Sequence, residues 1–368
     1  MNKAIKYRLY PNKEQIILIE KTFGCVRKIW NLMLADRKEY YKQHHETYKP
    51  QPSIYKNDYP FLKEIDSLAL CNTYLNLNHA YKRFFEDKRV GFPKFKTKKK
   101  SRKSYTTNNQ NGTICFTNNK HIKLPKLGVV KINGHKIPGD DWKLKSATVS
   151  KDSKGDYYVS VLFEFEQDIF PVSKNSDKVI GLDYKSNGLF FSSDNENCNM
   201  PHFFRKAQKK LARQQRSLAR RKENSNSRKK QNKKVNKIYV HVANQRKDFL
   251  HKKSTEIANQ YDVVCVETLD MKNMSNKGFG NGKATLDNGY GLFLTMLEYK
   301  LADRGKYFVK VDKWYPSSQL CYSCGKQHKE MKNLLNRQFV CDCGYENDRD
   351  TNASLNIKKE GLRLLTTV

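Results

Sequence analysis

The stretch CYSCGKQHKEMKNLLNRQFVCDCGYENDRD, residues 321–350, decides the organisation of the chain. It contains two tight cysteine pairs, Cys321 with Cys324 and Cys341 with Cys343, and a glycine follows each pair. Such pairs are typical of a tetrahedral zinc site, because each short turn delivers two sulfur donors to one point and the glycine lets the turn be tight. We therefore predict a zinc ribbon here. Two disulfides are the alternative, but the remaining cysteines are scattered and nothing indicates secretion.

Acidic residues follow the second cysteine pair directly. Asp348 and Asp350 lie in the run DRDTNA, residues 348–353, which opens a helix predicted over about 351–360. A zinc-stapled finger that abuts carboxylates indicates that the finger is attached to the rim of a reaction centre.

The charge of the chain points to a polyanionic partner. Lysines and arginines number 71 against 37 aspartates and glutamates, so the 368 residues carry a net charge of +34. Such a charge opposes a compact fold by self-repulsion unless a polyanion neutralises it. Phosphate backbones do so with release of counterions, and 21 tyrosines and 19 phenylalanines offer faces on which bases stack. The length favours two or more domains.

A membrane surface is the competing partner for a basic chain. The N-terminal segment MNKAIKYRLYP has no apolar signal core, and no run approaches the roughly 20 apolar residues of a membrane-spanning helix. Nine cysteines in a chain without a signal fit a reducing compartment. We expect a cytoplasmic protein that binds nucleic acid and no membrane.

The first part of the chain is predicted to be one strand followed by helices. Apolar alternation over residues 1–11 predicts an edge strand. Apolar residues at intervals of three and four predict a helix over about 12–41, capped by Asn12, and a second helix over about 64–86. The basic run GFPKFKTKKKSRKSY, residues 91–105, interleaves aromatic residues, which favours a nucleic-acid contact over a merely solvated lysine tract.

Short β-rich runs separated by turns follow over about residues 112–170 and predict a small antiparallel barrel. The N-terminal strand can complete that barrel. The helical block, about 12–111, is then an insertion between the first strand and the rest of the barrel.

The second half of the chain has the element order of an RNase H-like α/β unit. Its parallel strands should be buried on both faces, because VVCV within the third strand is continuously apolar. The predicted elements are a strand hairpin at 179–196, a basic helical hairpin at 200–260 broken at 224–227, a strand at 262–270, a loop at 275–291, a helix near 293–301 that stops at Gly305, a strand at 307–314 and the C-terminal helix.

Three carboxylates stand out on this unit. Asp183 lies within a strand, Glu267 ends a buried strand, and Asp350 opens a helix. A structural ion pair is the simplest role for any one of them, since a half-buried carboxylate needs a partner. Three on successive elements favour a shared site for Mg²⁺ or Mn²⁺, with Asp183 bridging two ions. Asp348 is better suited to be a helix cap or an outer-shell residue.

Several segments, in the order in which they occur, resemble the TnpB family, the OrfB-type proteins of bacterial insertion sequences that are related to the type V CRISPR effectors. The resemblance covers about residues 178–360 and extends more loosely into the N-terminal half. The segments are GLDYKSNGLF, RKAQKKLARQQRSLARR, ANQRKDFLHKKS, VVCVETL, MLEYKLADRG, WYPSSQLCYSCG and CDCGYENDRDTNASLNI, with FGCVRKIWN, YLNLNHAYKRFF and GFPKFK towards the N-terminus.

The resemblance implies an RNA-guided DNA endonuclease. Such a protein holds a guide RNA transcribed from the transposon end and cuts double-stranded target DNA beside a short transposon-associated motif in the bacterial cytoplasm. The number of chains per RNA stays open, with a monomer favoured. The family's catalytic Asp, Glu and Asp fall on Asp183, Glu267 and Asp350, and its zinc ligands on the four cysteines of the ribbon. This sequence departs from the family pattern at Tyr184, at Thr268 and in the C-x-C form of the second cysteine pair.

The same resemblance implies a multidomain α+β architecture. A wedge barrel carries an inserted helical recognition lobe, and a RuvC-type nuclease domain carries the inserted zinc ribbon. The implied boundaries are 1–11 and 112–173 for the wedge barrel, 12–111 for the helical lobe, 174–317 and 345–368 for the nuclease domain, and 318–344 for the ribbon.

Two other functions remain open at this point. The first is a catalytically silent RNA-guided DNA-binding protein of the same family, similar to a repressor. All three acidic positions are filled, which argues against it. The second is a DNA-joining transposase in its own right, but no His-x-His with a tyrosine nucleophile is found to support it.

Overall fold

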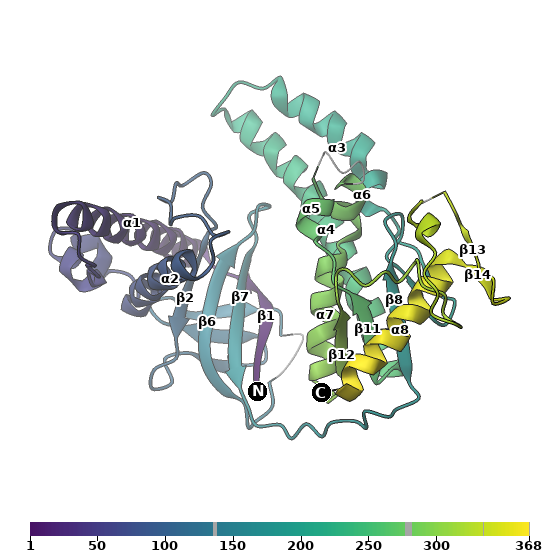
Figure 1. The fold of residues 1–368 in the computed structure, drawn as a ribbon. Helices are drawn as coiled ribbons and strands as arrows, with labels where there is room; N and C mark the ends of the chain where they lie inside the picture. The colour runs from purple at the N-terminus through teal and green to yellow at the C-terminus, as the bar shows by residue number, and fades with distance from the viewer. Residues whose placement is uncertain (135–137, 277–281, 334, 368) are drawn as a thin grey trace. The chain divides into compact units, whose positions relative to one another are not determined.

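The computed structural model describes residues 1–134, 138–276, 282–333 and 335–367. The chain forms two compact units, Met1–Gln167 and Asp168–Val368, and each has its own sheet and its own core (Figure 1).

The first unit is built on a seven-stranded sheet in the order β2-β6-β7-β1-β5-β4-β3, in which every neighbouring pair is antiparallel. The N-terminal strand lies in the middle of the sheet, between β7 and β5, and not at an edge. The strands are β1 Asn2–Tyr10, β2 Ser104–Asn108, β3 Cys115–Asn118, β4 His121–Leu124, β5 Gly128–Ile132, β6 Lys143–Lys151 and β7 Tyr157–Glu164.

This sheet curls strongly towards a barrel. Phe116 on β3 is three strands away from β1, yet its ring centroid lies 5.5 Å from that of Tyr7 on β1 and 6.2 Å from that of Phe163 on β7. Strands three apart in a flat sheet are separated by about 14 Å. The predicted barrel is therefore corrected to a curled sheet, because the described strands β2 and β3 each have one hydrogen-bonded neighbour and the hydrogen bonding does not close.

Strand β2 begins at Ser104, before the predicted start of the β region at residue 112. Its sequence SYTTN has little apolar content, but Tyr105 and Thr107 are buried on one side in strict alternation. Pairing with β6 thus stabilises this segment as a strand, although its local sequence does not predict one.

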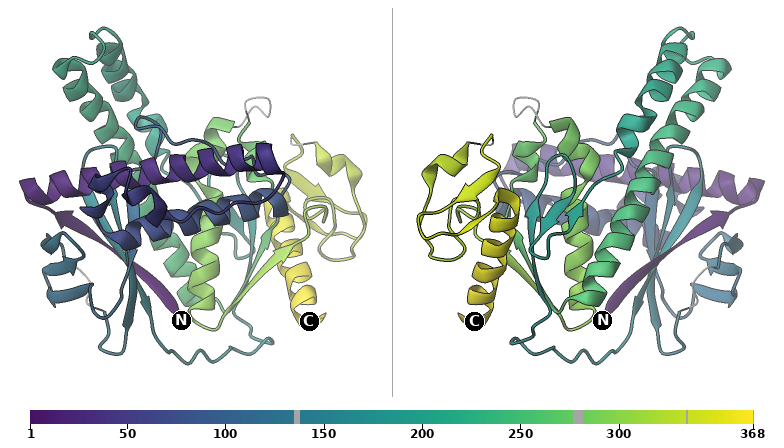
Figure 2. Two further views of the ribbon diagram at one scale, coloured as in Figure 1. Left: turned by 90° about the vertical axis from the view of Figure 1, so that its left-hand side faces the viewer. Right: turned by 90° about the vertical axis from the view of Figure 1, so that its right-hand side faces the viewer.

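Two long helices pack side by side in the first unit (Figure 2). Helix α1, Lys13–His44, begins at Asn12, whose side chain accepts a hydrogen bond from the Gln15 N–H, as the sequence predicts. Helix α2 covers Ser67–Glu86 and is capped by Asp66. Two 3₁₀ turns, Pro52–Lys56 and Pro60–Lys63, complete this layer.

The basic run 91–105 is fixed onto α1 along part of its length. The Trp30 ring N–H donates to the Lys94 carbonyl at 3.0 Å, and the Asn31 amide exchanges two hydrogen bonds with the backbone of Lys96. The amino group of Lys96 lies 3.5 Å from the centre of the Trp30 ring. These contacts hold the segment against the helix.

The second unit is built on a five-stranded sheet in the order β10-β9-β8-β11-β12. Strands β8, β11 and β12 are parallel, and β9 and β10 are antiparallel additions, so the predicted hairpin and buried parallel strand are confirmed. The strands are β8 Val179–Tyr184, β9 Phe190–Ser192, β10 Asn197–Cys198, β11 Val263–Glu267 and β12 Tyr307–Val311.

Helices cover both faces of this sheet (Figure 1). Ile180, Leu182, Val264 and Val266 face a core that α4 (Asn226–Gln260) and α7 (Tyr290–Ala302) complete. The alternate residues of the same strands face α8 (Arg349–Thr367). Helix α3, Phe203–Ala219, pairs with α4 as the predicted helical hairpin, and residues 220–225 separate the two helices.

Two predicted boundaries in the second unit are wrong. The C-terminal helix extends to Thr367 and does not end near residue 360, because Gly361 is buried against the sheet and the helix continues past it. The predicted loop at 275–291 contains α6, Gly282–Asn288, and follows a short α5, Met271–Met274; the stretch 277–281 of that loop lies outside the described residues.

The predicted cysteine finger forms a separate small module. Strands β13, Gln338–Val340, and β14, Glu346–Asp348, pair antiparallel, and a 3₁₀ turn at Lys329–Lys332 precedes them. Met331 and Phe339 form its small core together with two of the cysteines.

None of the helices in the described ranges combines the length and the apolar character that crossing a bilayer requires.

Candidate functional site

Asp183 and Glu267 meet where two parallel strands end. Leu182 of β8 pairs with Val266 of β11, so the next residue along each strand brings the two carboxylates side by side. Their side chains share a hydrogen bond. The Tyr184 N–H also lies 3.4 Å from Glu267 Oε1. The structure brings these two predicted residues together, and their role as metal ligands stays a prediction.

Asp350 approaches the pair from the first turn of α8. The neighbouring Asp348 caps that helix, since its Oδ1 accepts hydrogen bonds from the N–H groups of Asp350 and Thr351 at 2.8 and 3.3 Å. The expectation that Asp348 is a helix cap is confirmed. Asp350 lies 4.0 Å from a guanidinium nitrogen of Arg337 and is partly exposed.

The surroundings of Asp183 oppose the ionisation of its carboxyl group. Burial raises the pKa of the Asp183 carboxyl well above its usual value, and the charges of Glu267 and Asp350, together with the hydrogen bond to Glu267, raise it further. The guanidinium of Arg349 opposes the shift. Packed carboxylates of this kind are relieved either by a proton or by a metal ion.

The three carboxylates are not all in mutual contact. Among the described residues, the ribbon cysteines are the one group of three or more His, Cys, Asp or Glu side chains whose ligand atoms all lie within 4.8 Å of one another. Asp183 touches Glu267, and Asp350 acts on Asp183 through its charge. A site for two ions about 4 Å apart does not require every ligand to touch every other.

Sequence reasoning missed the aromatic residues that wall this corner. Tyr290, at the start of α7, is fully buried, and its ring centroid lies 4.7 Å from that of Tyr184. Its hydroxyl has no hydrogen-bond partner within the described part of the chain, and burial together with the charges of Glu267 and Asp183 raises its pKa well above the usual value. Nothing in the local sequence distinguishes Tyr290 from an ordinary core tyrosine.

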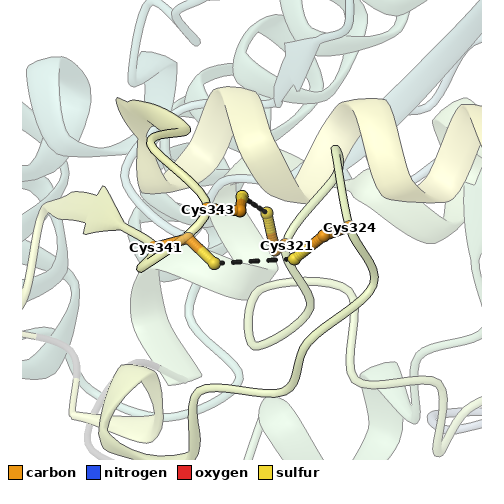
Figure 3. A group of neighbouring side chains, drawn as sticks. All are labelled: Cys321, Cys324, Cys341 and Cys343. Atoms are coloured by element: carbon orange, nitrogen blue, oxygen red, sulfur yellow. Dashed lines mark hydrogen bonds between the residues drawn. The ribbon is translucent and has the colours of Figure 1, made fainter.

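The four cysteine sulfurs of the ribbon form the second cluster (Figure 3). The Sγ atoms of Cys321 and Cys343 lie 3.6 Å apart, as do those of Cys324 and Cys341. Four sulfurs at 2.3 Å from a tetrahedral zinc ion are about 3.8 Å apart. The spacing fits zinc, and it is far beyond the roughly 2.05 Å of a disulfide bond. The disulfide alternative is therefore excluded.

Groups around the cysteines suit thiolate ligands. The backbone N–H of Tyr345 is directed at the Cys343 sulfur and, with hydrogen bonds from the other thiols, lowers the pKa of Cys343 to about 7. His328, which the sequence analysis did not single out, places Nε2 3.2 Å from the Cys341 sulfur and Nδ1 2.9 Å from Glu330. The imidazole is a neighbour of the kind that orients metal ligands.

Two buried amides tie the ribbon to α8. Asn352 donates to the Leu320 carbonyl at 2.8 Å and accepts from the Tyr322 N–H at 3.1 Å. Asn356, one turn later, donates to the carbonyls of Ser317 and Leu320. Because α8 also carries Asp350, the ribbon is attached to the helix that completes the carboxylate corner, as the sequence analysis expects.

Helix α8 is held close to the sheet by two glycines. A Cβ on Gly181 of β8 would lie 2.2 Å from the Ser354 carbonyl oxygen, and a Cβ on Gly361 of α8 would lie 2.2 Å from the Cys265 sulfur of β11. The helix thus crosses β8 and β11, the strands that carry Asp183 and Glu267, so closely that neither glycine position has room for a side chain. This packing sets the position of Asp350 relative to the strand ends.

Comparisons with known proteins agree with this arrangement. Three family models match: a "Helix-turn-helix domain" of OrfB proteins over residues 1–46, a "Probable transposase" model of OrfB proteins over 160–278, and a "Cas12f1-like, TNB domain" over 290–357. In the structure, residues 1–46 form β1 and α1 rather than two helices joined by a turn.

Two relatives match along nearly the whole chain. A protein of Streptomyces pristinaespiralis named "Putative RNA-guided DNA endonuclease" is 32% identical over 98% of this chain and 90% of its own length. Escherichia coli InsQ, which carries the same description, is 30% identical over 99% of this chain and 93% of its own length. A solved Cas12f1 in complex with guide RNA and target DNA superposes with a TM-score of 0.64 at 14% identity, over 97% of this chain and 98% of that one, so the fold is shared.

The fold and the relatives define the class of insertion-sequence-encoded proteins with a Cas12f1-like architecture. Within that class, this chain belongs to the TnpB family.

Proposed function

We propose that this protein is an RNA-guided DNA endonuclease that cleaves double-stranded DNA next to a short transposon-associated motif. The observation that carries the proposal is the contact of Asp183 with Glu267 at the ends of β8 and β11, within the field of Asp350. The relatives that align end to end carry the description of the same activity. A guide RNA from the transposon end supplies the sequence readout, and the protein supplies shape recognition and cleavage.

The topology of the second unit supports a RuvC-type, RNase H-like nuclease domain. Its order β10-β9-β8-β11-β12 places an antiparallel hairpin beside three parallel strands. The candidate ligands occupy the ends of the two central strands and the start of the helix that crosses them. We assign this domain to residues 174–317 and 345–368, the ribbon to 318–344, the wedge with its curled sheet to 1–11 and 112–173, and the helical lobe to 12–111, of which Ser104–Asn108 pairs with the sheet of the wedge.

Oxygen ligands of this type suit Mg²⁺ or Mn²⁺. Two such ions, bound by Asp183, Glu267 and Asp350, would supply an activated water and a stabilised leaving oxygen for phosphodiester hydrolysis. The raised pKa of Asp183 supports this proposal, because burial and the charges of Glu267 and Asp350 make its ionised form unfavourable without a cation.

The remaining residues of the site position these groups. The Tyr184 N–H restrains Glu267, the cap from Asp348 fixes the first turn of α8, and Tyr290 with Tyr184 forms a wall that keeps water from one side of the carboxylates. The Tyr290 hydroxyl makes no hydrogen bond among the described residues, but the charges of Glu267 and Asp183 reach it and help to raise its pKa.

A structural zinc ion in the ribbon supports the same function. Cys321, Cys324, Cys341 and Cys343 would hold it, and the amide contacts of Asn352 and Asn356 would transmit its rigidity to α8. With a net charge of +34, the chain is suited to a guide RNA and its DNA target in the bacterial cytoplasm.

Cleavage by purified protein with its copurified RNA tests the proposal. The RNA is sequenced first, and a DNA target that matches its guide segment is then built with a randomised flanking region. Asp183→Ala should abolish Mg²⁺-dependent cleavage and leave target binding intact, because the substitution removes a metal ligand but no cationic contact to the nucleic acid.

Asp248→Ala serves as the matched control, since Asp248 is an exposed acidic residue of α4 that is paired only with Lys252. It should cut like the wild type. Undiminished cutting by Asp183→Ala would refute the assignment, and loss of DNA binding by that variant would show a structural role instead.

A further inference from the structure

A pocket opens between the C-terminal half of α1 and the C-terminal half of α2. It encloses about 880 Å³, and we call it the aromatic pocket. The aromatic residues that line it are Tyr41, Tyr48, Tyr81, Phe84, Phe85 and Phe92. Pockets of about 300–1,000 Å³ enclose ligands of drug or nucleotide size. The pocket lies within the first unit, far along the chain from the carboxylates of the second.

The rings of the aromatic pocket form a fixed platform. Phe92 makes edge contacts with Tyr81 and Phe84, each with ring centroids 5.3 Å apart, and Phe85 continues the row at 5.2 Å from Phe84. The outer rings remain uncovered: Phe85 is 75% exposed and Tyr41 is 58% exposed. Exposed aromatic groups on this scale mark a surface at which a partner binds.

The charge of the pocket is almost entirely positive. Lys38, Lys49, Lys82 and Arg37 line it, against a single carboxylate from Glu46. Lys38 lies 5.2 Å from the centre of the Phe92 ring, which places an ammonium group at the edge of the platform. Such a surface is complementary to a polyanion that carries flat, stackable groups.

Arg37 at the base of the pocket strengthens this conclusion. Its side chain is buried at 7% exposure, and none of the ion pairs found among the described residues includes it. Asn78 is its polar partner, and its Nε atom has no hydrogen-bond partner. The guanidinium also lies 5.2 Å from the centre of the Tyr81 ring and 5.8 Å from that of Tyr74, so aromatic faces rather than a carboxylate surround its charge. Such a charge attracts a phosphate to the pocket electrostatically.

We propose that an unpaired segment of the guide RNA docks in the aromatic pocket, with its bases stacked on the exposed rings and its phosphates near Arg37 and the lysines. The inference rests on the proposed function in taking a guide RNA as the partner. It adds a site for single-stranded RNA in the helical layer of the first unit. Recognition of unpaired RNA commonly uses aromatic faces and guanidinium groups in this way.

The observations favour RNA over the other occupants. A second copy of this chain would bring the same cations face to face, which charge repulsion opposes. A displaced DNA strand would be present only while a target is bound, whereas the exposed Phe85 and Tyr41 need cover in the resting complex. The guide RNA is the polyanion that stays bound in that state.

Binding of a labelled 15-nucleotide oligouridylate to the RNA-free full-length protein tests the proposal. Phe85→Ala and Phe85→Leu should both weaken binding by roughly 5- to 150-fold, which corresponds to the loss of one base stack. The slope of log affinity against log salt should not change, because no cation is removed. A 15-base-pair RNA duplex should bind all variants equally, since its bases are not available for stacking.

Phe61→Ala is the control, because Phe61 is 39% exposed in the same unit but does not line the pocket. Unchanged oligouridylate binding by Phe85→Ala would overturn the proposal. Wild-type oligouridylate binding by Phe85→Leu would overturn it too, as would a Phe85→Ala variant that loses binding only to oligothymidylate. A third contrary result would be a dimer, seen by sedimentation, that Phe85→Ala dissociates without any change in RNA binding. These binding assays require no cleavage, so their outcome does not depend on the result of the nuclease test with Asp183→Ala.

Discussion

The carboxyl groups of Asp183 and Glu267 share a hydrogen bond across the ends of two paired parallel strands. Two carboxylates cannot share such a bond without a proton, because an ionised carboxylate only accepts. Without a cation Asp183 therefore retains a proton that an isolated carboxylate would release, and proton and metal ion compete for the same oxygens. The raised pKa of Asp183 expresses this competition.

The first prediction concerns stability against pH in metal-free buffer. Because the folded-state pKa of Asp183 is raised above its ordinary value of 3.8, the native protein binds more protons than the unfolded chain above that pH. Below pH 3.8 the Asp183 carboxyl group does not lower the free energy of unfolding. As the pH rises from 3.8 towards the folded-state pKa of Asp183, the free energy of unfolding falls by up to about 1.4 kcal/mol per pH unit.

Asp183→Asn isolates this effect, since the amide keeps the shape and cannot ionise. In EDTA at neutral pH the variant should melt at a higher temperature than the wild type, and the gap should close as the pH falls towards 4. Millimolar Mg²⁺ should stabilise the wild type and not the variant. A variant that melts below the wild type at every pH would contradict the predicted charge repulsion.

The second prediction concerns the ribbon. Cys324→Ser should lose stoichiometric zinc, because a hydroxyl is a poor replacement for a thiolate and structural zinc contributes roughly 10 kcal/mol or more in small modules. Cys71→Ser changes an exposed cysteine on α2, outside the cluster, and should retain zinc. Mass spectrometry of the metal bound to each purified protein measures the difference, and full zinc occupancy in Cys324→Ser would overturn the assignment.

Much of the carboxylate corner could be predicted from the sequence because each of its parts leaves a local pattern. Asp183 interrupts an apolar strand, Glu267 ends one, and Asp350 opens an amphipathic helix. The parallel strand order then brings strand ends to one edge. The short spacing within each cysteine pair likewise holds its two sulfurs close together, and the four sulfurs cluster as predicted.

The rest depends on contacts between residues that are distant in the chain. Asn352 and Tyr290 resemble ordinary polar and core residues until Leu320 and Glu267 are placed beside them. The curl of the first sheet depends on rings such as Phe116 that pack across non-adjacent strands. Domain boundaries within the first unit stay predictions, because β2 joins the sheet from within the stretch assigned to the helical lobe.

The third prediction tests the attachment of the ribbon to α8. Asn352→Ala removes the partner of the Tyr322 N–H, whereas the Leu320 carbonyl keeps the hydrogen bond from Asn356. Leaving the Tyr322 N–H unsatisfied costs about 1–3 kcal/mol locally. Hydrogen exchange at the Tyr322 amide should accelerate by roughly 5- to 150-fold if local opening governs exchange. Gln338→Ala, at an exposed ribbon position, should not alter it, and unchanged exchange in Asn352→Ala would show that the ribbon is held by other contacts.

The fourth prediction concerns the distance between α8 and the sheet. Gly361→Ala adds a Cβ that would lie 2.2 Å from the Cys265 sulfur and 2.6 Å from its Cβ, so the helix must shift. Overpacking of this kind costs about 1–3 kcal/mol, and the shift moves Asp350 relative to Asp183. The unfolding free energy should fall by that amount and the cleavage rate should fall with it. Gly91→Ala, where an added Cβ meets nothing within 4 Å, should change neither.

A double-mutant cycle separates this clash from the loss of helix flexibility. Cys265→Gly alone leaves a small cavity, but in combination with Gly361→Ala the new methyl group fills the space that the Cys265 side chain vacates, since the Cα of residue 265 lies 3.7 Å away. The double variant should therefore be more stable than the sum of the single changes predicts, with a coupling of about 0.5–3 kcal/mol. Strictly additive effects, measured by denaturant unfolding, would mean that α8 does not pack on β11 through this contact, and the position of Asp350 would then need another cause.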